Sequence, residues 1–154
     1  GGGPGDGGVP REQRWVFEFP PGQSADEYAR QLDFFGIEIA TRAGSNSLVY
    51  GSNFSSGAIR RTGLARADDR YYVSWSNQSR RAYDVELLGR AGIRVDPNAI
   101  ILQFLPKKVE EQLAQAEYNF KGRQPIEIAK TRFKINQTGG SYSFQVVSQD
   151  PLKF

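Results

Sequence analysis

The sequence predicts an α+β fold in which two to three helices pack on a mainly antiparallel sheet. Several short stretches alternate apolar and polar residues, which is the period of a half-buried strand. Two other stretches space their apolar residues as an amphipathic helix does, each after residues that favour a helix start. The last two alternating stretches flank Gly139-Gly140, which is typical of an antiparallel hairpin.

The first strand is predicted over Arg14–Phe19, where every second residue is aromatic, and it ends at Pro20-Pro21. Ser24 and Glu27 form a capping-box pattern, in which each side chain accepts a hydrogen bond from a backbone N–H of the first turn. Apolar residues at i, i+4 and i+7 then predict a helix that ends at Gly36: Tyr28, Leu32 and Phe35.

The middle of the chain is predicted to hold a hairpin, a loop, a strand and a helix. Ile37–Thr41 and Leu48–Tyr50 form the hairpin. Ser52–Asp69 is rich in Ser, Gly and Arg without clear periodicity, so it is predicted to be a long loop. Arg70–Ser76 alternates as a strand does, and Tyr83–Ala91 has the length of a short helix.

The last third is predicted to contain a central strand, a helix and a hairpin. Ala99–Leu105 is almost continuously apolar, as expected of a strand buried on both faces. Pro106 suits the start of the next helix. A hairpin of Ile126–Asn136 with Ser141–Ser148 follows, with a bulge near Ala129-Lys130 that brings its apolar residues into phase. The charged residues of the helix are predicted to face solvent: Lys107, Glu110, Glu111 and Glu117.

The order strand, proline, helix, hairpin occurs at 14–50 and again at 99–148, which indicates two βαββ-like halves. Residues 1–12 are rich in Gly and Pro and are predicted to be a flexible tether. Residues 13–150 then form a single α+β domain and 151–154 a C-terminal tail. This layout is similar to the outer portion of a bacterial membrane-anchored protein. That likeness implies an extracytoplasmic (periplasmic or cell-surface) location and leaves a cytoplasmic one open.

The chain contains no His, no Cys and no Met. The commonest general base, the thiol nucleophile and the soft metal ligands are therefore missing. The sequence also lacks the serine-hydrolase and calcium-loop motifs. We therefore predict no catalytic residue, no metal site and no cofactor, and a hydrolase that works without His or Cys is the third-ranked hypothesis. No run of about 18 apolar residues is present, which excludes a membrane-spanning helix within this segment.

The formal charge of +3 is unevenly distributed along the chain. Ser55–Val95 holds eight arginines against four acidic residues, while the rest of the chain is nearly balanced. Guanidinium groups present rigid donor pairs to phosphate and carboxylate, and neighbouring aromatic rings can stack on bases or sugars. The predicted binding residues are Arg60, Arg61, Arg66, Arg70, Tyr72, Arg80 and Arg81.

Two partner classes fit this basic segment. The leading hypothesis is a non-catalytic binding or scaffold domain of a larger, tethered protein, with an anionic protein or polysaccharide as its partner. The alternative is a single-stranded nucleic-acid-binding domain. The segment can also be interpreted without any partner, as a solvated basic loop beside core aromatic residues. The last hairpin also leaves an open sheet edge, which permits self-association by strand pairing, although the sequence leaves the oligomeric state undetermined.

Overall fold

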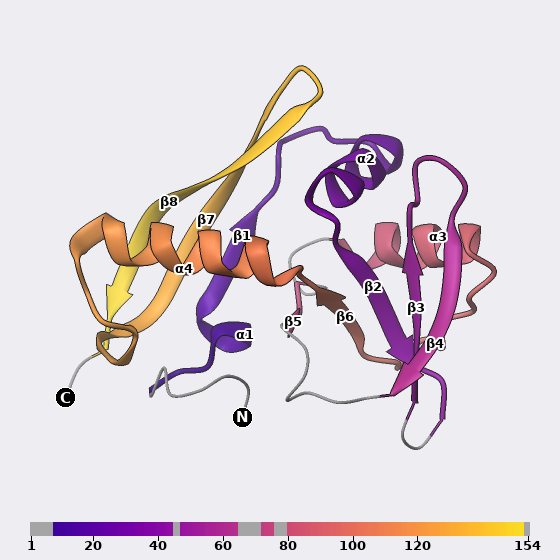
Figure 1. Cartoon of the computed structure of the whole chain (residues 1–154), viewed down its shortest axis with the longest axis horizontal. Helices are drawn as coiled ribbons and strands as arrows, with labels where there is room; N and C mark the ends of the chain where they lie inside the picture. Colours follow the sequence, from indigo (N-terminus) through magenta and orange to yellow (C-terminus); the bar gives the residue numbers. More distant parts are fainter. Residues whose placement is uncertain (1–7, 45–46, 65–71, 76–79, 153–154) are drawn as a thin grey trace.

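The structure of the chain, a computed structural model, describes residues 8–44, 47–64, 72–75 and 80–152. It confirms an α+β fold with helices packed on mostly antiparallel sheets (Figure 1). The elements up to residue 64 are α1 (Arg11–Arg14), β1 (Trp15–Glu18), α2 (Ala25–Phe35), β2 (Glu38–Arg42), β3 (Ser47–Ser52) and β4 (Ile59–Leu64). The elements that follow are β5 (Tyr72–Val73), α3 (Arg81–Arg90), β6 (Ile101–Phe104), α4 (Lys107–Lys121), the 3₁₀ turn η2 (Pro125–Glu127), β7 (Ile128–Thr138) and β8 (Ser141–Pro151).

The strands form a three-stranded sheet, β1-β7-β8, and a five-stranded sheet, β4-β3-β2-β6-β5. The pairing of β1 with β7 is parallel, and every other pairing is antiparallel. The predicted repeat of element order is present, but its first strands are exchanged. Strand β1 of the first half pairs with the hairpin of the second half, and β6 of the second half pairs with β2 of the first. The two halves are therefore interlocked and share one core.

The core between the sheets contains a group of packed aromatic rings. Trp15 and Phe17 of β1 are almost fully buried, as the alternation of this strand predicts. The Phe17 ring centroid lies 5.5 Å from that of Phe133 on β7 and 5.3 Å from that of Trp75, which follows β5. Each such ring pair contributes about 1 kcal/mol of stability in addition to the contribution from burying the rings. The rings thus join elements of both sheets into a single apolar cluster.

Helix α2 begins and ends as its sequence predicts. The Ser24 hydroxyl accepts a hydrogen bond from the Glu27 N–H at 3.1 Å, and the Glu27 carboxylate accepts one from the Ser24 N–H at 3.0 Å. Gly36 follows the helix with a φ of +71°, which only glycine adopts without strain. These two signals place the buried face of α2, including Tyr28 and Leu32, against the core.

Part of the predicted loop Ser52–Asp69 is the strand β4, which corrects that prediction. Strand β4 pairs with β3 from Ser52↔Ile59 to Ser47↔Leu64. The turn between them is held by the Asp33 carboxylate, which accepts hydrogen bonds from the N–H groups of Phe54 (3.0 Å) and Ser55 (2.9 Å). The strand shows no alternation because the side chains of Ile59–Thr62 are exposed on both of its faces.

Three further predicted features of the middle and last thirds are present, two of them with different bounds. The predicted strand Arg70–Ser76 corresponds to the short β5, with residues 70, 71 and 76 outside the described part. The predicted helix begins two residues earlier, at Arg81. The predicted bulge is confirmed by a register shift between Ile128 and Lys130.

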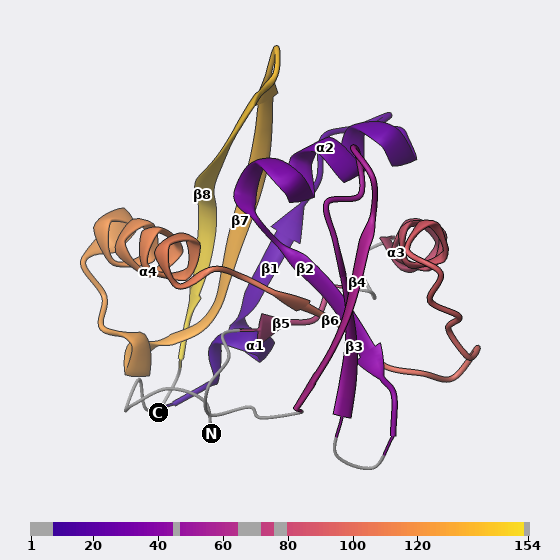
Figure 2. The ribbon, with the colours of Figure 1, turned by 45° about the vertical axis from the view of Figure 1, so that its right-hand side comes forward.

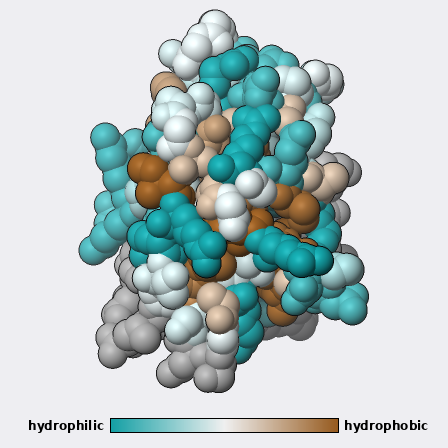
Figure 3. Space-filling view, turned by 90° about the vertical axis from the view of Figure 1, so that its right-hand side faces the viewer, coloured by the Kyte–Doolittle hydropathy of each residue, from teal (hydrophilic) through white to brown (hydrophobic). Residues whose placement is uncertain are grey.

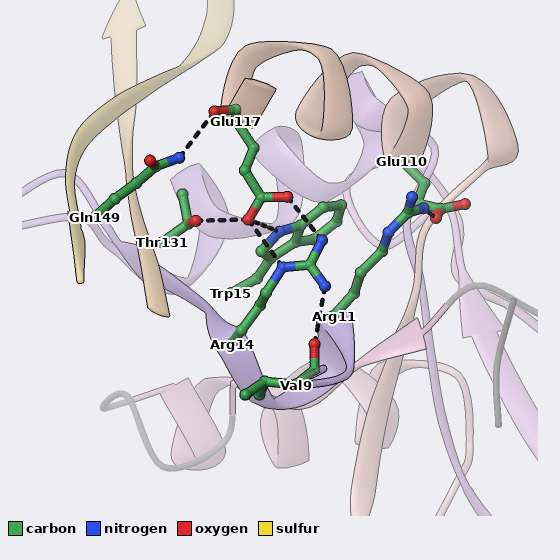
Figure 4. A network of polar contacts seen from close by, with 8 residues as sticks. All are labelled: Val9, Arg11, Arg14, Trp15, Glu110, Glu117, Thr131 and Gln149. Atoms are coloured by element: carbon green, nitrogen blue, oxygen red, sulfur yellow. Dashed lines mark hydrogen bonds and ion pairs between the residues drawn. The ribbon is translucent and has the colours of Figure 1, made fainter. Parts of the chain in front are cut away.

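Two of the acidic residues predicted to face solvent from α4 are buried instead. Glu117 accepts hydrogen bonds from Nε (2.9 Å) and Nη2 (2.7 Å) of Arg14, from Trp15 Nε1 (2.9 Å) and from Thr131 Oγ1 (2.5 Å) (Figure 4). Glu110, seven residues earlier on the same face of α4, forms an ion pair with Arg11. A buried carboxylate is tolerated only when it is paired in this way, and the two arginine partners lie more than 90 residues away in sequence.

Arg14 also anchors the start of the described chain. Arg14 Nη1 donates a 2.9 Å hydrogen bond to the carbonyl of Val9, so the segment before α1 folds back against this helix. Of the predicted tether, residues 1–7 lie outside the described part, whereas Arg11 and Glu12 belong to α1. At the other end, the Leu152 N–H donates to the Glu127 carbonyl at 2.8 Å.

Candidate binding surface at the edge strand β4

The seven residues predicted to form a binding surface occupy different parts of the fold. Arg60 and Arg61 lie on β4, and Arg80 and Arg81 lie at the start of α3. Arg66 and Arg70 lie outside the described residues, and for Tyr72 only the backbone, in β5, is described. Since β4 and β5 are at opposite edges of the five-stranded sheet, proximity in sequence does not bring the described members together.

Arg81 holds the loop that leads to β6. Its guanidinium donates hydrogen bonds to three backbone carbonyls, those of Ala99 (2.8 Å), Pro97 (3.0 Å) and Asp96 (3.2 Å). These bonds satisfy carbonyl groups of a non-regular segment, which would otherwise need water. Arg81 therefore has a structural role in this loop.

Arg80 lies against aromatic rings at the wall of a groove. Its guanidinium carbon is 4.3 Å from the ring centroid of Phe19, 5.3 Å from that of Tyr83 and 5.4 Å from that of Tyr28. Its Nη2 donates to Gln23 Oε1 at 3.1 Å. Partial burial lowers the pKa of Arg80, although an arginine remains a cation at any physiological pH. With residues 16–23, Arg80 and Tyr83 line a groove of about 540 Å³.

A buried polar network lies behind Arg80. The Asp84 carboxylate, on α3, accepts a hydrogen bond from the Tyr28 hydroxyl (2.5 Å) and one from Gln103 Nε2 (2.9 Å). The Tyr28 hydroxyl in turn accepts a hydrogen bond from Trp75 Nε1 at 2.8 Å. Burial raises the pKa of Asp84 from its ordinary 3.8 to about 7, and burial also raises the pKa of Tyr28. Asp84 and Tyr28 are fully enclosed, so neither can contact a partner directly.

Sequence reasoning did not identify this network. A short helix with one acidic residue in its first turn is usually solvated there, because a carboxylate at a helix N-terminus is favourable in water. No sequence signal connects Asp84 to its partners, which are Tyr28 on α2 and Gln103 on β6, or connects Tyr28 to Trp75.

Strand β4 presents an unusual run of exposed residues. It is the last strand of its sheet, and within the described chain its only strand neighbour is β3. The four consecutive residues Ile59–Thr62 are exposed, and Ile59 retains 55% of its accessible surface. Figure 3 looks onto the side of the molecule where β4 and α3 lie, and shows hydrophilic residues interspersed with hydrophobic ones. Both faces of β4 are therefore open to a partner.

Arg61 projects from one face of β4 and is held in place by two neighbours. It forms a two-point ion pair with Glu38, with Nη2–Oε1 at 2.7 Å and Nε–Oε2 at 3.1 Å. Its guanidinium carbon lies 3.9 Å from the ring centroid of Tyr50. The hydrogen bonds to Glu38 raise the pKa of Arg61 further. Its side chain nevertheless keeps 45% of its surface exposed, so an approaching anion can still reach the fixed guanidinium.

Arg60 projects from the opposite face of β4, since successive residues of a strand alternate. It donates one hydrogen bond, from Nη1 to the carbonyl of Gly92 at 3.2 Å, and has no acidic partner among the described residues. Among the described residues, therefore, no acidic neighbour compensates the charge of Arg60. The two arginines give the edge of β4 positive charge on both of its faces.

Among the described residues, no group of three or more Asp and Glu residues has the geometry to hold a metal ion. None of the described helices has the length and apolar character needed to cross a membrane. The chain matches no protein family model, no curated protein and no solved structure.

Proposed function

We propose that the protein is a non-catalytic binding module that takes an extended, acidic segment of a partner protein onto the open edge of β4. The observation that carries this proposal is that β4, one short strand, has a backbone edge that no described strand covers and two exposed arginines, Arg60 and Arg61.

The backbone of β4 supplies the first part of the interaction. An edge strand carries a row of N–H and C=O groups directed away from its sheet, and an extended peptide can pair with them as an additional strand. The turn at Asp33, Phe54 and Ser55 fixes the start of β4, so this edge is formed before a partner arrives. A polysaccharide or a nucleic acid lacks the peptide groups that this pairing needs.

The arginines supply the second part, which is selectivity. A residue directly opposite Arg60 in an added strand shares the face of Arg60, and its neighbour shares the face of Arg61. Two consecutive acidic residues can therefore each meet one guanidinium. Arg60 should contribute more, because Arg61 already shares its charge with Glu38.

The same charges disfavour pairing of β4 with a second copy of itself. Such a pairing would place the arginines of two chains close together, and like charges across adjacent strands are destabilising. An acidic strand reverses the sign of that interaction. The charge of β4 thus favours an acidic partner over a second β4.

Binding of three blocked peptides to the full chain tests the proposal. The first has a central Asp-Glu pair between Val and Thr residues, the second has Asn-Gln instead, and the third keeps Asp-Glu but has alternate amides N-methylated. We expect only the first to bind well, measured by titration calorimetry at low salt. N-methylation removes the backbone donors and the Asn-Gln change removes the charge, so each should weaken binding at least about tenfold.

A pair of variants with equal charge change locates the site. Arg60→Glu with Thr62→Glu alters two exposed residues on one face of β4 and leaves the Arg61–Glu38 pair intact. Lys107→Glu with Gln112→Glu makes the same change in charge at exposed positions of α4. The first variant should lose peptide binding and the second should keep it.

Equal binding by both variants would contradict the proposal. Equal binding of the N-methylated peptide would also contradict it, since the contact would then depend on charge alone. Tight, salt-sensitive binding of an oligothymidylate without binding of the acidic peptide would replace the proposal with a nucleic-acid partner.

A further inference from the structure

The two sheets have four edges, and these edges differ in how well they are protected. Strand β4 carries two arginines, β5 is two residues long, and β1 is four residues long and is soon followed by Pro20-Pro21. Charge, shortness and proline are the usual means by which proteins prevent edge-to-edge pairing. The fourth edge is β8, with eleven residues, and it is the longest of the four.

Strand β8 carries no charge along most of its length. The nine residues from Ser141 to Gln149 are uncharged, and Asp150 is the first charged residue of the strand. A second copy of β8 would therefore meet no electrostatic repulsion along this edge. This neutrality distinguishes β8 from β4, whose arginines repel a second copy.

The hairpin of β7 and β8 extends away from the body of the molecule (Figures 1 and 2). In both views no described element lies along the outer edge of β8 near the hairpin tip. The register of the hairpin shifts between Arg132 and Phe133, which leaves Val147 as an extra residue on β8. Such a bulge bends the strand and interrupts regular pairing. The regular part of the free edge is therefore Ser141–Val146.

An exposed aromatic side chain lies beside this edge. Phe34, on α2, keeps 51% of its surface accessible, and its ring centroid is 5.5 Å from that of Tyr142 on β8. An exposed phenylalanine next to an unprotected strand edge is typical of a surface that becomes covered on association.

From these observations we infer that the protein associates with a second copy of itself by antiparallel pairing of the two Ser141–Val146 edges. The twofold axis is perpendicular to the sheet, so each face of one sheet continues into the same face of the other. Tyr142, Phe144 and Val146 then form one apolar face across both copies, and the exposed residues Ser141, Ser143 and Gln145 form the other. The paired segment is short, so the association is weak.

This inference is independent of the function proposed for β4. Sedimentation equilibrium of the full chain tests whether the protein self-associates. We expect the average mass to rise from monomer towards dimer at protein concentrations of about 0.1 to 1 mM. Ser141→Lys with Ser143→Lys places lysines on the exposed face of the edge, opposite the neutral Thr138 and Asn136 of β7. This variant should remain monomeric with unchanged thermal stability, because edge lysines oppose pairing.

Two control variants separate this edge from the rest of the surface. Asn98→Lys with Gln112→Lys adds the same charge at exposed positions outside β8, and Arg60→Glu with Thr62→Glu alters the β4 edge of the five-stranded sheet. Both should associate as the unmodified chain does. A chain that stays monomeric at about 1 mM would overturn the inference. Association of the Ser141→Lys, Ser143→Lys variant equal to that of the unmodified chain would also overturn it.

Cysteine cross-linking gives a second, geometric test, because the chain has no cysteine of its own. A disulfide needs Cα atoms about 5.5 Å apart, which is the spacing of residues opposite one another in paired strands. Single variants Ser143→Cys and Phe144→Cys sample both candidate centres of the pairing, and Gln112→Cys is the control. Rapid disulfide dimerisation of one β8 variant, well above the rate of the control, is expected. Rates equal to the control for both would contradict β8 pairing.

Discussion

The hydroxyl of Tyr28 and the carboxylate of Asp84 form a 2.5 Å hydrogen bond between helices α2 and α3, where neither residue contacts solvent. Gln103 Nε2 donates to the other carboxylate oxygen, and the charges of Arg80 and Arg81 favour the ionised carboxylate less than these two hydrogen bonds do. The carboxylate is therefore stabilised mainly by neutral donors. Burial dominates, and it raises the pKa of Asp84 to about 7.

This raised pKa predicts that stability decreases with rising pH. Between about pH 4 and about pH 7 the folded state holds a proton on Asp84 more tightly than the unfolded chain does. The resulting stabilisation is fully present below pH 4 and is lost as pH rises through about 7. Its upper limit is about 4 kcal/mol, at 1.4 kcal/mol per pKa unit. Urea unfolding at pH 5 and at pH 8 measures the difference.

The variant Asp84→Asn is the control for this pH dependence. It cannot ionise, so its free energy of unfolding should change much less between pH 5 and pH 8, whatever its absolute value. Glu27 and Asp150 have lowered pKa values, so their contribution has the opposite sign and is lost as pH falls through the acid range. Equal slopes for the unmodified chain and for Asp84→Asn would show that Asp84 is not the titrating group.

The buried pair of Arg14 and Glu117 predicts a large cost for removing one partner alone. Arg14→Met leaves the Glu117 carboxylate buried without its cation, and we expect a loss of about 3 to 5 kcal/mol. Arg14→Met together with Glu117→Met removes both charges and should lose distinctly less. Urea unfolding of the three proteins gives this comparison. A double variant less stable than Arg14→Met would contradict the assignment.

Two glycines predict opposite effects of the same substitution. A Cβ at Gly51 on β3 would lie 2.9 Å from Phe54 Cε1 and 3.2 Å from Leu88 Cδ2, so Gly51→Ala should destabilise by about 1 to 3 kcal/mol. A Cβ at Gly89, within α3, meets no atom within 4 Å. Gly89→Ala should stabilise by about 0.5 to 1 kcal/mol, because alanine is the better helix former. Thermal unfolding of both variants tests the packing of α3 on β3, and a stabilising Gly51→Ala would refute it.

The exposed pair of Arg61 and Glu38 predicts a small energetic coupling. Both side chains are partly exposed, so water and salt screen their attraction. A double-mutant cycle with Arg61→Ala and Glu38→Ala should give about 0.2 to 1 kcal/mol at low salt and less at high salt. A salt-independent coupling above about 2 kcal/mol would mean that Arg61 is mainly a structural residue of β4.

Local patterns predict those parts of the fold in which one face is buried and the other is exposed. The alternation at Trp15 and Phe17 and the capping box at Ser24 and Glu27 each act within a few residues, so the sequence reports them directly. Strand β4 has no such signal, because Ile59–Thr62 are exposed on both of its faces and no apolar alternation marks it. Its start depends on Asp33, which lies more than 20 residues away.

The buried charges and the candidate site depend on contacts that local patterns do not contain. Glu110 and Glu117 resemble solvated helix residues until α1 brings Arg11 and Arg14 to the same face. Arg80 and Arg81 belong to the basic segment in sequence, but Arg80 donates to Gln23 and Arg81 to Ala99, both outside that segment. Arg60 and Arg61 are the described members of the predicted set that remain at an open surface.

Amide hydrogen exchange of β4 in the presence of the Asp-Glu peptide tests the central claim most directly. Amides of β4 that point away from β3 should exchange quickly in the free chain and become protected when the peptide pairs with the edge. The account predicts new protection at alternate residues of Ile59–Leu64 and little change in β8. Peptide binding that leaves these amides unprotected would contradict the account.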